Sequence, residues 1–250
     1  MENICLIDGD SIIWLASYTY KGQEVKSLKG VMECCDDYMR NILKACNSEY
    51  YSAFLTDGSF RYSYATIKPY KGNRVKMEKP QFFNTIRGYL NDHYGFQYIK
   101  NYEADDLCIM AHNTFSTNKE YNPIIASPDK DLKQIAGVFY DYKKRILEEV
   151  TEEQANRNLW MQMLTGDTGD NIPGLPNIGA SKAPKILGDT NYQEKVLVAY
   201  IEHYGEYDGI LNFTENYRLL KMRTTLDGIL YSPKIIKGSD VIKDSIEDLW

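Results

Sequence analysis

Ile4-Cys5-Leu6-Ile7-Asp8-Gly9-Asp10 joins a continuous apolar run to an acidic residue and a glycine. A short apolar run followed by a turn is typical of a buried strand in a parallel sheet. Residues 124–127 form a second such run, and Asp129 follows it. Ligands of open α/β sheets bind at the carboxyl ends of the strands. These two acids are therefore expected at a functional edge of the sheet.

Strand-like and helix-like segments alternate along the first 150 residues. Residues 30–46 show a helical period of apolar side chains, and residues 80–94 have Pro at the first turn. This βαβ order predicts an α/β fold with a mainly parallel sheet flanked by helices. The predicted strands are 4–7, 51–56, 97–99, 124–127 and 137–142, and the predicted helices are 30–46, 80–94 and 103–115.

The character of the chain changes near residue 151. Residues 152–164 and 192–223 read as helices, and the tail 227–250 is weakly patterned. We predict an α/β domain over residues 1–150, with a short, irregular and basic arch segment at about 61–79. A helical region over residues 151–250 would follow, with a glycine hairpin at 166–187.

Nine acidic residues fall in five short clusters. Carboxylates gathered from several strand ends repel one another at low dielectric, so such a cluster is stable only when cations join it. Hard oxygen ligands favour Mg²⁺ or Mn²⁺, and two such ions about 4 Å apart are a device for cutting phosphodiesters. The clustered acids are Asp8, Asp57, Glu103, Asp105, Asp106, Asp129, Asp131, Asp167 and Asp170.

The net charge of −6 does not argue against a nucleic-acid partner, because the acids are concentrated. Without the nine clustered acids the chain would carry +3 (−6 plus 9), and two divalent cations would neutralise much of the cluster. No apolar run approaches the roughly 20 residues of a membrane span, and the N-terminus lacks a signal-like pattern. The five cysteines show no zinc spacing. We therefore expect a cytoplasmic protein that does not bind membranes.

A glycine-rich segment between two helical stretches carries separate information. Gly174 and Gly179 frame a tight turn, with Lys182 just beyond it. Glycines allow a phosphate to approach the backbone closely, and the following helix offers free amides. Such a hairpin would grip nucleic-acid backbone without reading bases. An ordinary glycine turn is the alternative.

The order of these motifs resembles the 5′-nuclease family, which includes flap endonucleases, phage 5′–3′ exonucleases and the 5′-nuclease domains of bacterial DNA polymerases. The resemblance runs from Asp8 to about Ala183, and phage exonucleases look most alike. Asn177 stands where the hairpin usually has glycine, and since Asn tolerates left-handed backbone we expect the turn to survive. The matching motifs are Asp8-Gly9-Asp10, Thr56-Asp57-Gly58, Tyr70-Lys71-Gly72-Asn73-Arg74, Glu103-Ala104-Asp105-Asp106, Asp129-Lys130-Asp131 and Gly166-Asp167 to Asp170-Asn171-Ile172-Pro173-Gly174.

The resemblance implies a PIN-like fold with a helix–turn–helix-like (H3TH) DNA-binding hairpin, and two metal sites. It implies two Mg²⁺ or Mn²⁺ ions, and a K⁺ ion at the glycine hairpin is a further expectation. The tighter site would use Asp8, Glu103, Asp105 and Asp106, with Asp57 bound directly or through water. The looser site would use Asp129, Asp131, Asp167 and Asp170.

The same resemblance assigns the remaining functional residues. Lys71 and Arg74 would sit in the arch on the scissile phosphate and act in catalysis with Asp8 and Asp106. The residues expected to bind substrate are Arg61, Tyr70, Gly174, Gly179 and Lys182. The implied partner is DNA with a 5′ end, nick or flap, with RNA–DNA hybrids and replication proteins as further candidates. Because segment 61–79 is short for an arch that a long flap could thread, we expect mainly 5′–3′ exonuclease action on duplex DNA.

Several alternatives compete with these assignments. Asp8-Gly9-Asp10 after a strand also resembles haloacid-dehalogenase phosphatases, which would use Asp8 as nucleophile and Asp10 as acid. A DNA-binding module without catalysis, and a PIN-type ribonuclease without the hairpin, are two more. At single positions, Asp10 is expected to cap the next helix. Asp57 could serve only a turn, and the basic run near Lys71 could be a solvated surface.

Overall fold

A six-stranded sheet forms the centre of the computed structural model, which describes residues 1–19 and 21–242. The strand order is β5-β4-β3-β1-β2-β8. The four inner strands are parallel, whereas β5 and β8 run antiparallel at the edges. The predicted α/β fold with a mainly parallel sheet is therefore confirmed. The strands are β1 (Glu2–Asp8), β2 (Tyr50–Phe54), β3 (Tyr121–Ala126), β4 (Gly137–Asp141), β5 (Ile146–Val150) and β8 (Ile236–Lys237).

Strand β1 is the most enclosed strand, because it lies between β2 and β3 and is covered on both faces. Its residues from Ile4 to Asp8 are all buried, as expected for a central strand of a parallel sheet. Asp8 pairs in register with Phe54, the last residue of β2. The acid that ends β1 is thus held at the carboxyl edge of the sheet by the strands on either side.

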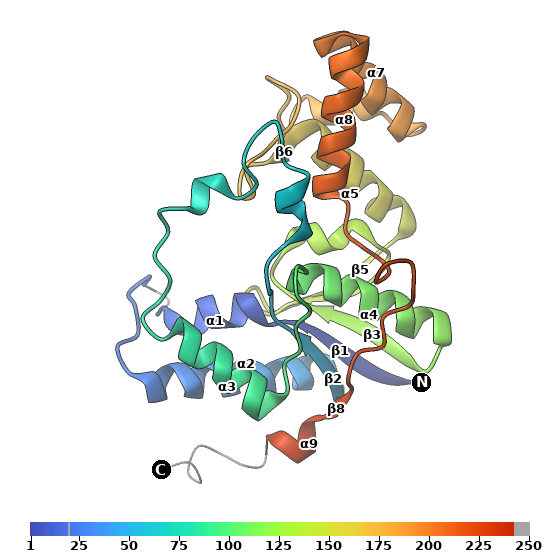
Figure 1. Ribbon diagram of the computed structural model, residues 1–250. Coiled ribbons are helices and arrows are strands. Elements are labelled where there is room, and N and C mark those ends of the chain that lie inside the picture. Colours follow the sequence, from blue (N-terminus) through green and yellow to red (C-terminus); the bar gives the residue numbers. More distant parts are fainter. Residues whose placement is uncertain (20, 243–250) are drawn as a thin grey trace.

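Helices cover both faces of the sheet (Figure 1). One core packs α1 (Gly9–Ser17), α2 (Leu28–Ala45) and α3 (Phe83–Tyr94) against the sheet, and a second packs α4 (Ala104–Asn118) against the other face. Each fully buried aliphatic side chain in these cores contributes about 1.5–3 kcal/mol. The sheet edge that carries the acids is therefore a rigid platform.

A helical lobe stands over the carboxyl edge of the sheet (Figure 1). Its helix α5 begins at a capping box formed by Thr151 and Gln154. A third core fills the lobe, where the rings of Trp160 and Tyr217 stack 5.7 Å apart. No helix in residues 1–19 and 21–242 is long and apolar enough to cross a membrane. The lobe contains α5 (Glu152–Thr165), β6 (Gly166–Asp167), β7 (Ile172–Pro173), α6 (Ala183–Leu187), α7 (Tyr192–Tyr204) and α8 (Glu206–Leu220).

Three features differ from the sequence expectations. Residues 97–99 are not a sheet strand, since only isolated bridges such as Phe54 to Gln97 form there. Strand β4 continues into an antiparallel hairpin with β5. The tail leaves the helical region: β8 pairs with β2, and α9 (Gly238–Val241) follows it. A two-residue pairing has no periodicity, so no pattern could reveal it. Residues 243–250 of the weakly patterned tail lie outside the described residues.

One buried histidine makes stability depend on pH. His112 of α4 is packed against Gly137, and burial lowers its pKa to about 4. In the unfolded chain its pKa is about 6.5. Protonation below that value therefore favours unfolding, and the stability present near neutral pH is lost as the pH falls toward 4.

We expect that His112→Gln removes this dependence. Between pH 7 and pH 5 the parent should lose about 2 kcal/mol more unfolding free energy than the variant. Urea unfolding at several pH values measures the difference. His203→Gln, at an exposed position of α7, is the matched control and should follow the parent. An unchanged slope for His112→Gln would contradict the assignment.

Candidate active site

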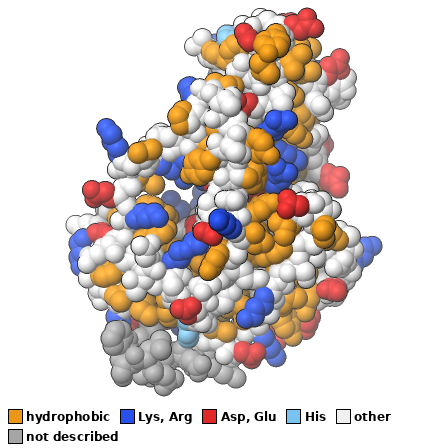
Figure 2. All heavy atoms as spheres, in the orientation of Figure 1, with side chains coloured by type: hydrophobic (Ala, Val, Ile, Leu, Met, Phe, Trp, Pro, Cys, Tyr) orange, Lys and Arg blue, Asp and Glu red, His pale blue; other side chains and the backbone are white. Residues whose placement is uncertain are grey.

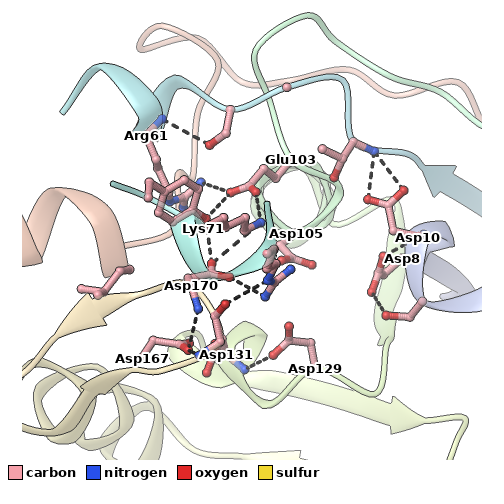
Figure 3. Close-up of a pocket in the computed structure, with 18 of the residues that line it drawn as sticks. Asp8, Asp10, Arg61, Lys71, Glu103, Asp105, Asp129, Asp131, Asp167 and Asp170 are labelled. Atoms are coloured by element: carbon pink, nitrogen blue, oxygen red, sulfur yellow. Dashed lines mark hydrogen bonds and ion pairs between the residues drawn. The ribbon is translucent and has the colours of Figure 1, made fainter. Parts of the chain in front are cut away.

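The carboxyl ends of three parallel strands meet at one cleft. Asp8 ends β1, Asp57 follows β2 and Asp129 follows β3, and all three line a cleft of about 810 Å³. Two loops add more acids, from the start of α4 and from the turn between β6 and β7. Figure 3 shows Asp8, Asp105, Asp129 and Asp170 converging from separate elements. The cleft is also lined by Asp10, Glu103, Asp105, Asp131, Asp167 and Asp170.

Asp8 is fixed by hydrogen bonds on both oxygens. It caps α1 by accepting the Asp10 amide at 3.1 Å, and it accepts the hydroxyls of Ser11 and Ser127, each at 2.9 Å. Burial raises the pKa of Asp8 to about 7, with Asp10 and Asp129 adding to the rise. The side chain is therefore held in place while its negative charge lacks a compensating cation.

The carboxylates of Asp105 and Asp131 show the same shortage of positive charge. Burial, and then the neighbours Asp8 and Asp129, raise the pKa of Asp105 well above its usual value. Burial, a hydrogen bond with Asp167 and the charge of Asp129 raise the pKa of Asp131 to about 8. Anionic oxygens crowded in this way are the donor set that a divalent cation requires.

The acids are separated rather than closed into a cage. Among the described residues no three His, Cys, Asp or Glu side chains already enclose a point as a bound metal ion would need. In the part of the chain that the structure describes, Asp8, Asp105 and Asp131 have raised pKa values and no ion pair with Lys or Arg. They lie on three different elements. Their carboxylate oxygens suit divalent cations, and a bound cation would have to draw them together.

An arch, defined here as residues 64–82, runs from the helical lobe to α3 (Figure 1). A hollow lies beside it, with Lys and Arg side chains at its rim (Figure 2). Lys71 bonds to Glu103 and lies 3.8 Å from Asp170, and Arg74 donates to Asp170 at 2.6 Å. Burial alone would raise the pKa of Glu103, but Lys71 and Arg61 outweigh it and hold the pKa below its usual value. The arch, where Lys71 and Arg74 were expected to lie, thus brings both cations against the acids of the cleft.

Arg61, Asp106 and Tyr70 are all buried, and each is bonded to acids of the site or to its partner in the site. Arg61 was expected to bind substrate, but its side chain is 2% exposed and donates to Asp106 at 2.5 and 3.0 Å. Asp106, expected to bind metal, is fully buried with both oxygens committed to this pair and does not line the cleft. Tyr70 is buried, and its hydroxyl contacts Glu103 and Asp170 at 2.8 and 2.7 Å. Asp106 thus lies behind the cleft, whereas Arg61 and Tyr70 line it and contact its acids.

The two hairpin glycines serve different purposes. A Cβ on Gly174 would lie 2.3 Å from the Thr165 carbonyl carbon and 2.4 Å from the Gly166 nitrogen, so this glycine is needed for packing rather than for a phosphate. Gly179 faces open space, and Lys182 is exposed beside it. Asn177 has φ of 62°, so the expected left-handed turn does form with Asn in place of Gly.

Three other residues of the cleft had not been predicted to lie there. Asp10 does not cap α1, because Asp8 does; instead Asp10 accepts the Thr56 amide at 3.2 Å and lies 3.9 Å from Arg87. Gln162 of α5 donates to Asp167 at 3.3 Å. The repeated Asp in Asp8-Gly9-Asp10 was a usable signal for Asp10. Arg87 and Gln162 are isolated polar residues on helices and gave none.

The fold and the acidic cleft define a class of α/β proteins with a metal-ready carboxylate edge under a basic arch. Residues 3–159 match the family model described as "5′-3′ exonuclease, N-terminal resolvase-like domain". The chain belongs to this 5′-nuclease family, as the sequence motifs predicted.

Individual relatives agree with this membership. DNA polymerase I of Bacillus subtilis is 27% identical over 82% of this chain and 25% of its own length. A 5′-3′ exonuclease of Aquifex aeolicus is 29% identical over 60% of this chain and 57% of its own length. The chain thus spans about a quarter of the polymerase. The crystal structure of a bacteriophage T5 flap endonuclease with DNA and metal ions has a TM-score of 0.64 at 17% identity, covering 99% of this chain and 98% of that one.

The buried ion pair of Arg61 yields a stability prediction. Arg61→Met leaves the carboxylate of Asp106 buried without its cation and leaves Glu103 with Lys71 alone, which should cost about 3–5 kcal/mol of unfolding free energy. Urea unfolding measures the loss. Arg74→Met, at a side chain 43% exposed, should change stability far less. Adding Asp106→Leu to Arg61→Met should restore part of the loss, and an equal or greater loss in the double variant would refute this account.

Proposed function

We propose that this protein is a divalent-metal-dependent 5′–3′ exonuclease that acts on duplex DNA. One observation carries the proposal: carboxylates from three strand ends, the start of α4 and the Gly166–Asp170 turn face a single cleft that two arch cations enter. Family membership supports it and decides against the dehalogenase-like phosphatase interpretation of Asp8 and Asp10. The metal and DNA in the T5 flap endonuclease structure are consistent with it.

Two groups of acids would hold the cations. We assign Asp8, Asp57, Glu103 and Asp105 to one group, and Asp129, Asp131, Asp167 and Asp170 to the other, all of which line the cleft. Bound Mg²⁺ or Mn²⁺ would supply an acidified water and neutralise charge on the phosphate. Asp106 acts indirectly, since it orients Arg61 behind Glu103.

The arch cations would act on the phosphate itself. Lys71 and Arg74 already reach acids that we assign to both groups, namely Glu103 and Asp170. With metal ions held by those acids, Lys71 and Arg74 would be free to face a phosphate in the cleft. Positive groups placed where charge grows stabilise the transition state more than the ground state. Their loss should therefore lower the cleavage rate more than the affinity.

The glycine hairpin would hold the duplex through its backbone. Gly179 and Lys182 are exposed on the turn before α6, while Ile178 packs against the core of the lobe. This H3TH-like element is where we propose duplex contact, with K⁺ as a candidate ion. A grip of this kind contacts phosphates and is independent of base sequence.

Metal dependence and polarity test the proposed function together. Duplex DNA labelled at the 5′ or the 3′ end should give short products from the 5′ end with Mg²⁺ or Mn²⁺, and none with EDTA. Ca²⁺ should support binding with little cutting, because it is larger and activates water less well. A 5′-flap substrate and an RNA–DNA hybrid, run in parallel, rank the substrates. Cleavage in EDTA, digestion from 3′ ends, or hydrolysis of small phosphomonoesters alone would refute the proposal.

The hairpin contact has its own test. Gly179→Val should fold normally, because no atom lies within 4 Å of the added Cβ, yet it should block close approach of the duplex. Lys182→Ala should remove one phosphate contact and flatten the salt dependence of binding by about one unit of slope. Lys195→Ala on α7, whose ammonium bonds to Leu187 within the lobe at 3.2 Å, is a control. Normal duplex affinity for both hairpin variants would mean that the hairpin is only structural.

A further inference from the structure

Lys71 adopts a backbone conformation that lysine rarely uses. Its φ and ψ are 53° and 21°, in the left-handed region. That region costs a residue with a Cβ about 1–2 kcal/mol, and Asn or Asp tolerates it better than Lys. Strain of this kind persists only where the surroundings over-determine it. Neighbouring contacts must therefore hold Lys71 in this conformation.

Two asparagines provide these contacts, because they tie the arch to the β6–β7 turn both before and after Lys71. Asn73 of the arch donates its side-chain amide to the Thr168 carbonyl at 2.6 Å. Asn171 of the β6–β7 turn donates in the opposite direction, to the Pro69 carbonyl at 2.8 Å. Between them the Lys71 amide donates to the Asp170 carbonyl at 2.8 Å. We call Asn73 and Asn171 the asparagine clasp.

The clasp joins the arch cations to the turn that carries Asp167 and Asp170. Gly72 fits against it closely, since a Cβ there would lie 3.0 Å from the Pro69 Cβ and 3.4 Å from the Asn171 Nδ2. Arg74 is tied to the same turn, donating to the Gly169 carbonyl at 2.9 Å. The positions of both arch cations relative to the acids are thus set by backbone contacts as well as by their own charges.

We infer that Asn73 and Asn171 are positioning residues, which hold Lys71 in its left-handed conformation so that its ammonium stays in the cleft. The inference rests on the proposed function, in which Lys71 contacts the scissile phosphate. Without the clasp, Lys71 relaxes to the right-handed region that lysine prefers, and its side chain leaves the cleft. A small displacement of a catalytic group costs a large part of the rate.

A purely structural role for Asn73 and Asn171 would predict a different result. Both clasp bonds lie at exposed positions, where a hydrogen bond contributes only about 0.5–1.5 kcal/mol to stability. Their loss should barely change the melting temperature. A positioning role instead predicts a large fall in the cleavage rate while folding and duplex affinity are kept.

The experiment compares Asn73→Ala and Asn171→Gly with the parent under single-turnover conditions. Glycine at position 171 keeps the left-handed backbone, with φ of 60° in the parent, and removes only the amide. We expect the cleavage rate to fall about 10-fold or more, with the duplex Kd and the melting temperature close to those of the parent. Asn113→Ala is the matched control, because Asn113 also donates its amide to a distant carbonyl, that of Thr224 at 3.0 Å, away from the cleft.

A double-variant cycle shows whether the clasp acts through Lys71. In the Lys71→Ala background, adding Asn73→Ala should lower the rate no further, because the group it positions is gone. A further loss equal to that seen in the parent background would overturn the inference. So would parent-like rates for both single variants when the parent itself cuts DNA. Failure of the parent to cut any DNA would overturn the proposed function itself and is thereby distinguished.

Discussion

Mutual repulsion among carboxylates is the constraint around which this molecule is arranged. The parallel sheet brings acids to one edge, and burial makes their charges costly. One acid is neutralised permanently: Asp106 pairs with Arg61 inside the protein. Others are met by arch cations that are partly exposed, such as Arg74. The remainder, Asp8 and Asp105 among them, keep raised pKa values. This gradation separates acids that stabilise the fold from acids left for a cation.

The elements that fix the acidic edge could be predicted because local pattern and tertiary structure agree there. β1 is a continuous apolar run with an acid at its end, and a central parallel strand needs that composition. The acids in the first turn of α4 suit a helix N-terminus. Where the local pattern and the tertiary structure agree in this way, the structure can be predicted from the sequence. The strand ends, the order of the acids and the place of Lys71 and Arg74 could thus be inferred in advance.

The failures share one physical cause, which is that a partner distant in sequence decides the outcome. From the sequence alone Arg61 resembles a surface cation. Its guanidinium in fact also donates to the Leu219 carbonyl at 2.7 Å, 158 residues away. Gly174 resembles a phosphate-binding glycine, yet it is required because the backbone at Thr165 and Gly166 passes so close. β8 is two residues long and gains its strand character only from pairing with β2. None of these partners leaves a mark on the local sequence.

The turn that bears Asp167 and Asp170 also links the chemistry to the proposed duplex grip. Asp167 accepts the amides of Gly169 and Asp170 at 2.6 and 3.1 Å, which folds the turn onto itself. Just after it, the Leu175 amide donates to the Leu164 carbonyl at 2.9 Å and anchors the hairpin to α5. One compact segment therefore carries two carboxylates on its cleft side and the hairpin on its outer side. That segment also contacts the arch. The same short stretch of backbone would therefore position a duplex held at the hairpin relative to both the acids and the arch cations.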